Sequence, residues 1–403
     1  ILLCCLYKLN SFKASSMTPT FRVYNGGVNL VFGVNGLAEL KNVLSSMRRP
    51  VIVTGRRSAV ESGALAEVTK VLEESGVSYV VYDRATPNPT LQQAEELAEY
   101  YRSEGGVEFI AIGGGSVIDL AKSARVIVAG GGSVREYFNG LRQAPREKPL
   151  LFVVNTTHGT GSEVDRFAVL TDEGELEKRG FPAGYPDYGV DDPRYTLTLP
   201  VNQSVYTSID ALSHAIEAAT SRASSPYTEL LSVEASKRVF EYLPRVVGNP
   251  RDLEARYWLL YASMLGGIAI DHSLTHLGHG LEHVLSAYNP KLPHGAGLAL
   301  VHAKLVEYIY KARPETTWRI LSAVDPGLRP RSEVAQRAAS AFKGFLERVG
   351  FSEGLGDYGF TPGEVERLFK SVVSRKSMRR YVELAPFEVT EGLLSEVASG
   401  LPY

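Results

Sequence analysis

A group of histidines and one aspartate in the second half of the sequence is spaced as metal ligands are. Asp210 and His214 are four residues apart, which puts both side chains on one face of a helix. Five of the eight histidines lie at positions 272, 276, 279, 283 and 294, and the first four are spaced to form one stripe on a single predicted helix. Each histidine alone would more often be an ordinary hydrogen-bonded residue. Three neutral imidazoles and a carboxylate, however, bind Fe(II) or Zn(II), so the group predicts a metal site.

A turn of glycines in the first half indicates a second kind of chemistry. An apolar segment at 109–112 is followed by the glycine turn: Gly113, Gly114, Gly115 and Ser116. Glycine lets the backbone approach a ligand closely, and the N-terminus of the helix that follows attracts anions. We expect Ser116 to cap that helix and Asp119 to lie on its first turns. The pattern favours a phosphate site, but it matches neither the P-loop nor the G-x-G-x-x-G fingerprint, and a tight turn without a ligand has the same residues.

A loop rich in hydroxyl groups follows the next apolar segment, at 150–154. This hydroxyl loop (156–163) contains Thr156, Thr157 and Thr160. Ligands of open α/β sheets bind at the carboxyl ends of the strands, so we interpret these threonines as contacts to a nicotinamide or ribose. The alternative is an ordinary loop in which a hydroxyl caps the next helix.

The two halves of the chain differ in pattern, which predicts the elements that position these residues. Short apolar segments alternate with helical patterns before residue 200, as is typical of a doubly wound parallel sheet. We predict strands at 50–54, 77–82, 109–112 and 150–154, and helices at 62–75, 90–104 and 116–129. After Pro200 long amphipathic stretches dominate, at 208–220, 227–242, 252–287, 296–311, 333–349 and 390–399. We therefore expect an α/β dinucleotide-binding domain at 17–200 and an all-helical metal-binding domain at 201–403.

Composition excludes several other classes of protein. The chain has 403 residues, with 43 Lys and Arg against 45 Asp and Glu, for a formal net charge of -2. This balance argues against a nucleic-acid partner. The two cysteines, Cys4 and Cys5, are adjacent and build neither a disulfide framework nor a cysteine zinc site. We interpret residues 1–16 as an extension outside the fold. No apolar stretch reaches the roughly 18 residues of a membrane span, so we expect a cytoplasmic protein without a membrane partner.

Together these motifs resemble the iron-containing (group III) alcohol dehydrogenases, from about Phe21 to near the C-terminus. The segments that carry the resemblance are 87–90, 113–122, 156–163, 210–217, 279–283 and 293–295. The resemblance implies a dehydroquinate-synthase-like architecture, with a dinucleotide-binding α/β domain, a helical C-terminal domain and the active site in the cleft between them. It also implies a homodimer or a higher homo-oligomer.

The resemblance gives roles to single residues. The metal ligands that it implies are Asp210, His214, His279 and His294. His283 lies close to the metal in this family and is the candidate that moves the substrate proton. Cofactor contacts are implied for the glycine turn and the hydroxyl loop, for Asn88 on the nicotinamide side, and for Lys178.

The chain departs from the family pattern after the predicted strand at 50–54. Family members that prefer NAD have an aspartate there, which holds the ribose hydroxyls. This chain instead has Gly55, Arg56, Arg57 and Ser58. A carboxylate repels a 2′-phosphate, whereas guanidinium and hydroxyl groups bind one, so we predict a preference for NADP(H). The alternative is that both arginines are solvated surface residues.

Two further departures concern the substrate side. His272 and His276 stand where the family more often has small or amide residues, and they either line a polar pocket or lie on a helix surface. Asp165 replaces a frequent threonine, and one extra residue separates His283 from His294. A loop absorbs such an insertion easily, but the insertion changes the shape of the pocket.

The expected activity is hydride transfer between NADP(H) and a small alcohol, aldehyde or ketone, with one Fe(II) or Zn(II) as Lewis acid. Three alternatives remain: a metal-independent maleylacetate-reductase-like enzyme, a dehydroquinate-synthase-like lyase, and a metal-binding relative without catalysis. The complete ligand set disfavours the first alternative. The lack of the lyase motifs, together with Gly55, disfavours the second, and the joint presence of metal and cofactor motifs disfavours the third.

Overall fold

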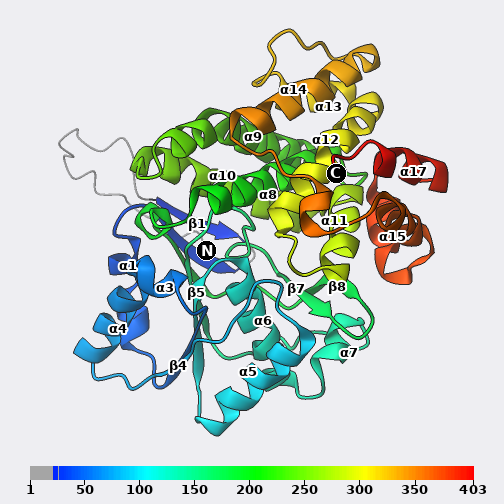
Figure 1. Cartoon of the computed structure of the whole chain (residues 1–403). Coiled ribbons are helices and arrows are strands. Elements are labelled where there is room, and N and C mark those ends of the chain that lie inside the picture. The colour runs from blue at the N-terminus through cyan, green and yellow to red at the C-terminus, as the bar shows by residue number, and fades with distance from the viewer. Residues whose placement is uncertain (1–20, 26) are drawn as a thin grey trace, which may run out of the picture.

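The computed structural model describes residues 21–25 and 27–403, so the extension predicted at 1–16 lies outside the described residues. Figure 1 shows two parts, an α/β part built from the first half of the chain and a helical part built from the second. In the described part of the chain the last strand ends at Asp191, and every element after it is a helix. The fold class predicted from the sequence is confirmed.

A seven-stranded sheet forms the centre of the α/β part, in the order β1-β2-β9-β6-β5-β3-β4. Its strands are β1 (Phe21–Asn25), β2 (Val28–Phe32), β3 (Pro50–Thr54), β4 (Val80–Tyr82), β5 (Glu108–Gly113), β6 (Leu151–Asn155) and β9 (Tyr188–Asp191). All neighbouring strands are parallel except β1 and β2. The strands β3, β5 and β6 are buried along their whole length, as expected where helices cover both faces.

Helices cover the sheet on both faces. Ile52 of β3 packs in one core with α1 (Gly36–Glu39), α2 (Lys41–Ser45), α3 (Ser58–Glu61) and α4 (Ala64–Glu74). Its neighbours Val51 and Val53 pack in another core with α5 (Leu91–Ser103), α6 (Gly115–Gly130) and α7 (Val134–Phe138). Successive residues of a strand point to opposite faces, so these two cores are the two layers of a doubly wound sheet.

The sequence patterns located four strands and missed the others. They did not indicate β1, β2, β9 or the antiparallel hairpin of β7 (Phe167–Asp172) and β8 (Glu177–Pro182). The strand β9 has four residues, and β8 carries Glu177, Lys178 and Arg179 in succession, so neither shows an apolar alternation. The hairpin packs against α6 on one side and α11 on the other, and thus connects the two parts of the chain.

Ten α-helices of the described chain form the helical part. They are α8 (Val201–Thr220), α9 (Pro226–Gly248), α10 (Leu253–Ser273), α11 (Leu277–Tyr288), α12 (His294–Ala312), α13 (Pro314–Leu321), α14 (Ala335–Arg348), α15 (Pro362–Ser374), α16 (Arg379–Leu384) and α17 (Glu391–Ser399). None of the helices in the described residues has the length and apolar character needed to cross a bilayer.

The single helix predicted at 252–287 is wrong. The chain leaves the helical conformation between α10 and α11, where Leu274 has φ +60° and ψ 168°. Both helices bury their apolar sides in the same core. The hydrophobic spacing therefore continues from α10 into α11, and the sequence pattern does not show the break between them. The four histidines of the predicted stripe therefore do not share one helix face.

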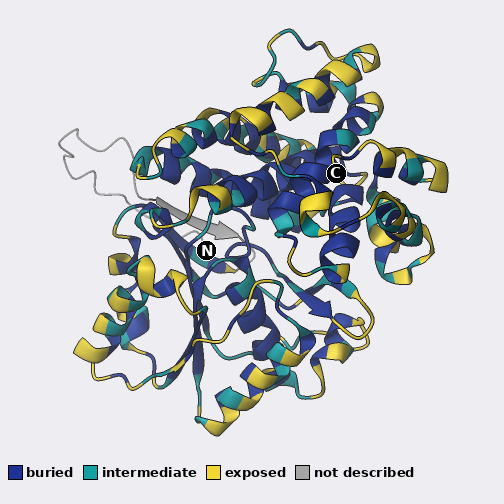
Figure 2. Ribbon diagram, viewed as in Figure 1, coloured by how far each residue is buried: buried dark blue, intermediate teal, exposed yellow. Residues whose placement is uncertain are grey.

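The two parts share a continuous core, which Figure 2 shows as buried residues running from the sheet into the helices. Val28, Leu30 and Phe32 of β2 belong to the same cluster as the helical part. The ring of Phe32 meets that of Tyr257 on α10 edge to face, with 5.0 Å between centroids. The strand β2 thus packs the sheet directly against the helical part.

Gly161 of the hydroxyl loop and Gly267 of α10 form another close contact between the two parts. Gly161 has φ +65°, and a Cβ there would lie 2.4 Å from Cα of Gly267. We expect Gly161→Ala to lower the free energy of unfolding by about 1–3 kcal/mol, because backbone cannot yield to the added methyl. Gly344→Ala on α14, where a Cβ meets open space, is the matched control and is expected to be neutral or stabilising by up to about 1 kcal/mol. Urea unfolding of both variants measures the difference, and equal midpoints would contradict the packing argument.

Candidate active site

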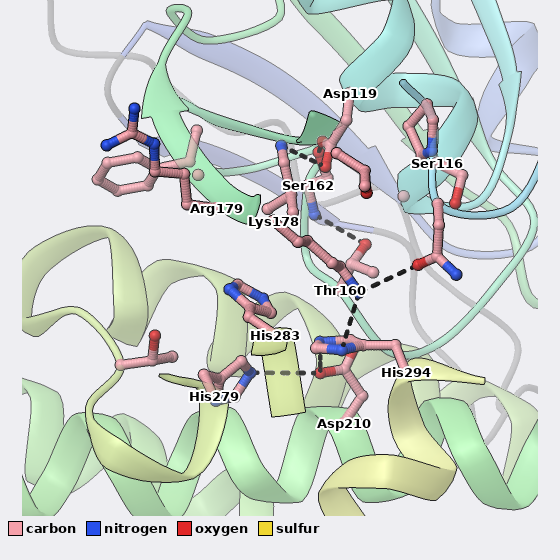
Figure 3. A pocket seen from close by; sticks show the side chains of 18 of the residues that line it. Ser116, Asp119, Thr160, Ser162, Lys178, Arg179, Asp210, His279, His283 and His294 are labelled. Carbon is pink, nitrogen blue, oxygen red and sulfur yellow. Dashed lines mark hydrogen bonds and ion pairs between the residues drawn. The ribbon is translucent and has the colours of Figure 1, made fainter. Parts of the chain in front are cut away.

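A cavity of about 1120 Å³ lies where the two parts of the chain meet. The glycine turn, the hydroxyl loop and the β7–β8 hairpin line one side, and residues of α8, α11 and α12 line the other. Figure 3 shows side chains from both sides pointing toward one another. The glycine turn and the hydroxyl loop follow the carboxyl ends of β5 and β6, the position at which open α/β sheets bind ligands.

The four predicted metal ligands converge on the helical side of the cavity. Asp210 and His214 lie one turn apart on α8, His279 lies on α11, and His294 is the first residue of α12. The Nε2 atoms of His214, His279 and His294 lie 3.5, 3.6 and 3.6 Å from Oδ1 of Asp210. The donor atoms of Asp210, His279 and His294 all lie within 4.8 Å of one another. His214 lies beside this group, next to Asp210 and stacked on His279.

This group of donors fits a divalent metal ion. Oδ1 of Asp210 and Nε2 of His279 are buried without a hydrogen-bond partner among the described residues, although native structures rarely leave buried polar atoms unsatisfied. The rings of His214 and His279 stack with 4.8 Å between centroids, which keeps their nitrogens side by side. Three imidazole nitrogens and a carboxylate oxygen are a donor set that both Fe(II) and Zn(II) accept.

Two buried glutamates hold two of the imidazoles from behind. Oε1 of Glu217 lies 2.9 Å from Nδ1 of His279, and Oε2 of Glu282 is hydrogen-bonded to Nδ1 of His294. A proton on Nδ1 leaves the Nε2 lone pair of each ring free for a metal. The motifs did not single out either glutamate, although Glu217 follows His214, and Glu282 follows His279, by the three residues that place two side chains close together on a helix.

The buried charges of this region do not balance by themselves. Burial acts to raise the pKa of Asp210, Glu217 and Glu282, but neighbouring histidines, together with Lys178 for Glu282, hold all three pKa values below the ordinary range. Among the described residues, the one ammonium in contact with these carboxylates is that of Lys178, 3.5 Å from Glu282. Burial acts to lower the pKa of His279, but Glu217 and Asp210 raise it to about 9, so this imidazole carries a proton when no metal is bound. A divalent cation that displaced this proton would balance the three carboxylates together with Lys178.

Lys178 and Asn88 meet beside the metal ligands. Nζ of Lys178, on β8, donates to Oδ1 of Asn88 and to Oγ of Ser286, both at 3.0 Å. The same Nζ lies 3.4 Å from Nδ1 of His294. Both predicted cofactor residues therefore line the cavity at its metal end, where the nicotinamide of a dinucleotide would have to lie for hydride transfer.

His283 lies one turn after His279 on α11, and its ring centroid is 5.5 Å from that of His294. Burial, followed by the charge of Lys178, holds the pKa of His283 well below its ordinary value, so the imidazole is neutral. Its Nδ1 lies 3.1 Å from Oη of Tyr381 on α16. Nothing in the sequence pointed to Tyr381, because it stands on a six-residue helix that shows no amphipathic pattern.

The glycine turn packs directly on the hydroxyl loop. A Cβ at Gly114 would lie 2.7 Å from Cγ2 of Thr157, and one at Gly115 would lie 2.4 Å from Cγ2 of Thr160. The expectation that Ser116 caps the helix is wrong, because α6 begins one residue earlier, with Gly114 as its N-cap and no side-chain cap. The first N–H groups of α6 thus lack a side-chain acceptor at the cavity wall, an arrangement that suits an anion.

The predicted cofactor residues differ in how they reach the cavity. Those that line it are Gly55, Ser58, Asn88, Gly114, Gly115, Ser116, Asp119, Thr157, Thr160 and Lys178. The lining does not include Gly113, Thr156, Arg56 or Arg57, and both arginines are exposed beside Gly55. The carboxylate of Asp119 accepts hydrogen bonds from Oγ of Ser162 and from the backbone N–H of Val169, and so ties α6 to the hydroxyl loop and to β7.

The histidines at 272 and 276 do not line the cavity. His272 is exposed at the end of α10, and its ring meets that of Tyr227 edge to face at 5.3 Å. His276 is buried behind the metal ligands, with Nε2 3.0 Å from Oγ1 of Thr220 and its backbone N–H donating to Glu217. His272 is thus a helix-surface residue, whereas His276 belongs to the buried polar group around Glu217.

Asp165, the third departure from the family pattern, is buried in the α/β part. Its carboxylate pairs with Nζ of Lys122 at 3.0 Å and accepts the backbone N–H of Phe167 at 2.7 Å. Burial raises the pKa of Asp165 to about 7, although Lys122 acts in the opposite direction. These contacts fix the turn that leads from the hydroxyl loop into the hairpin.

Comparison with known proteins gives matches along nearly the whole described chain. Residues 28–193 match the model of a family described as iron-containing alcohol dehydrogenase. Residues 204–393 match the C-terminal model of the Fe-containing alcohol dehydrogenase family.

Two curated proteins and two solved structures illustrate these similarities. The chain is 36% identical over 374 residues to the long-chain primary alcohol dehydrogenase AdhA of Thermoanaerobacter ethanolicus, a match that covers 91% of this chain and 94% of that one. It is 31% identical to the choline dehydrogenase of Bacillus subtilis (strain 168), with 78% and 79% covered. An iron containing alcohol dehydrogenase superposes with TM-score 0.79 at 27% identity, with 94% and 98% covered. The NADH-dependent butanol dehydrogenase A of Thermotoga maritima superposes with TM-score 0.82 at 25% identity, also with 94% and 98% covered.

The geometry distinguishes His294 from His272, which stood in the same predicted series of histidines. We expect His294→Ala to lower metal affinity at least about tenfold, because it removes one of four convergent donors. His272→Ala is the matched control and is expected to keep the metal content of the wild type, because its side chain is exposed and does not reach the cavity. Elemental analysis after equilibration with a metal buffer measures both variants. Equal metal contents, or a loss in the His272 variant alone, would contradict the assigned site.

Proposed function

The chain belongs to the iron-containing alcohol dehydrogenase family, and on this premise we propose that it interconverts a small alcohol and its aldehyde or ketone with NADP(H) in preference to NAD(H). It is an NAD(P)-dependent oxidoreductase that acts on alcohols. One observation carries the proposed alcohol–carbonyl reaction. A single cavity contains both the ligand group around Asp210 and the glycine turn at the start of α6.

The ligand group would hold one Fe(II) or Zn(II) through Asp210, His214, His279 and His294. Bound there, the metal would supply Lewis acidity to the oxygen of an alcohol or carbonyl. The glutamates behind His279 and His294 keep both Nε2 atoms turned toward the cavity, so the site is organised before a substrate arrives.

The α/β part would bind and orient the dinucleotide. The uncapped N-terminus of α6 and the backbone of the glycine turn would take the pyrophosphate. Thr157 and Thr160 would contact the ribose or nicotinamide, and Lys178 with Asn88 would hold the nicotinamide end beside the metal ligands. Hydride then passes between the nicotinamide and the substrate carbon. His283 or solvent moves the hydroxyl proton.

The preference for NADP(H) follows from the residues after β3. Gly55 and Ser58 line the cavity where relatives that prefer NAD have a carboxylate. Arg57 is paired with Glu61 at 2.7 Å, which weakens its attraction for a phosphate. Arg56 is exposed and has no ion pair among the described residues, so we propose Arg56 as the cation that binds the 2′-phosphate.

We also infer that the chain is a homodimer or a higher homo-oligomer, as the family resemblance suggests. A cytoplasmic location and the division into domains at 17–200 and 201–403 stay predictions. The absence of a nucleic-acid partner is supported by the formal net charge of -2.

The proposed activity is tested by the reduction of a panel of small aldehydes and ketones with NADPH and NADH side by side. Each assay is run on the purified enzyme, after complete chelation, and after adding back Fe(II) or Zn(II). We expect chelation to abolish turnover and added metal to restore it, because the substrate oxygen needs the Lewis acid. Turnover that survives chelation would instead support a maleylacetate-reductase-like enzyme. Stoichiometric binding of metal and nucleotide without turnover of any substrate would support a non-catalytic relative.

The cofactor preference is tested by Gly55→Asp, which restores a carboxylate beside the ribose. We expect KM for NADPH to rise at least about tenfold while KM for NADH falls, because the carboxylate repels a 2′-phosphate and accepts ribose hydroxyls. Arg56→Ala is expected to raise KM for NADPH more than Arg57→Ala does, because Glu61 already engages Arg57. A wild type that uses NADH better than NADPH, or equal effects of the two arginine variants, would contradict the assignment.

A further inference from the structure

Tyr381, in the C-terminal region, contacts His283, the residue that we propose moves the substrate proton. Tyr381 stands on α16, outside every motif that indicated the metal or the cofactor, and it lines the same cavity. Its Oη lies 3.1 Å from Nδ1 of His283. The two rings meet edge to face, with 5.5 Å between centroids and 85° between planes.

The packing of α16 on α11 places this hydroxyl. Gly280, between His279 and His283 on α11, faces Tyr381, and a Cβ at Gly280 would lie only 2.9 Å from Cβ of Tyr381. The start of α16 is held from the other side, because Ser377 in the preceding turn (Lys376–Met378) donates to Glu177 of β8 at 2.6 Å. Tyr381 is therefore held against His283 between α11 and the hairpin.

The direction of the hydrogen bond follows from what each group can donate. A phenol has one proton to donate, and the acceptor within hydrogen-bond distance of the Tyr381 hydroxyl in the described chain is Nδ1 of His283. Burial raises the pKa of this phenol, so it keeps its proton at neutral pH. If Nδ1 carried the imidazole proton instead, the phenol proton would lose its acceptor, and the lone pair of Nε2 would face the carboxylate of Glu282, 4.0 Å away. Both consequences are unfavourable.

We propose that Tyr381 is a positioning residue for the reaction: its hydroxyl donates to Nδ1 of His283 and holds the imidazole in the tautomer that carries its proton on Nε2. That Nε2–H lies next to Glu282 and the metal ligands, where it is a hydrogen-bond donor for the oxygen of a bound substrate. During carbonyl reduction this oxygen gains negative charge as the hydride arrives, and an oriented donor stabilises it. This role rests on the proposed alcohol–carbonyl chemistry.

Tyr381→Phe tests the role in the full-length, metal-loaded enzyme, because it removes the hydroxyl and keeps the ring. With the aldehyde that the wild type reduces best, we expect kcat to fall about tenfold or more while KM for NADPH and the metal content stay unchanged. Tyr310→Phe is the matched control. Its hydroxyl donates to the carbonyl of Arg329 at 2.7 Å in a fully buried position outside the cavity, so its loss is expected to leave kcat at the wild-type value.

The tautomer of His283 can be measured directly, and it would not change if Tyr381 only stabilised the fold. In ¹⁵N spectra of the histidine-labelled, Zn(II)-loaded protein, the His283 signals are assigned by their loss in His283→Gln. We expect an unprotonated, hydrogen-bonded Nδ1 and a protonated Nε2 in the wild type, and a shift of the Nδ1 signal in Tyr381→Phe. A protonated Nδ1 in the wild type, or a kcat of Tyr381→Phe within about twofold of the wild type, would overturn the proposal. If the wild type reduces no carbonyl compound, the proposed function fails, and the tautomer still decides the hydrogen bond.

Discussion

Three buried carboxylates that face a single ammonium group set the main constraint on this structure. Asp210 lines the cavity, and Glu217 and Glu282 are buried behind it. Among the described residues, Lys178 is the ammonium in contact with these carboxylates. Charge in a low-dielectric interior is strongly destabilising unless it is paired. A divalent cation held by Asp210 and three imidazoles would remove the imbalance. The two glutamates then act by orienting His279 and His294 rather than as isolated charges.

The same constraint explains why elements from both parts of the chain have to meet closely. The helices α8, α11 and α12 carry the proposed ligands, while the β7–β8 hairpin places Lys178 beside Glu282 and Ser286. The glycine contacts of the hydroxyl loop with α6 and α10 leave no room for side chains between these elements. The glycine turn, the hairpin and the helices with the proposed ligands thereby line one cavity, which would hold a nicotinamide beside the proposed metal site. The helix α16, near the C-terminus, completes this cavity on the side of His283.

Sequence reasoning succeeded where chemistry depends on local spacing. The pair Asp210 and His214 and the glycine turn are set by neighbouring residues, and the buried strands show as apolar segments. Sequence reasoning failed where packing between segments distant in sequence determines the local structure or the contact. The apolar pattern at 252–287 continues through the break at Leu274 because α10 and α11 face the same core. Tyr381 reaches His283 across 98 positions, and no local pattern records such a contact. The choice of His214, His279 and His294 as metal ligands came from the family resemblance and not from their spacing, since His272 shares the spacing but is exposed.

The central claim, that the buried charge requires one divalent cation, is tested most directly by titrating the metal-free full-length protein with Zn(II). Binding stoichiometry and unfolding temperature are followed together. The account predicts saturation at about one metal ion per chain and a rise of several degrees in the unfolding temperature, because an ion that binds the folded state alone stabilises it. An unfolding temperature that does not respond to metal, while the metal-free protein is fully folded and stable, would contradict the claim.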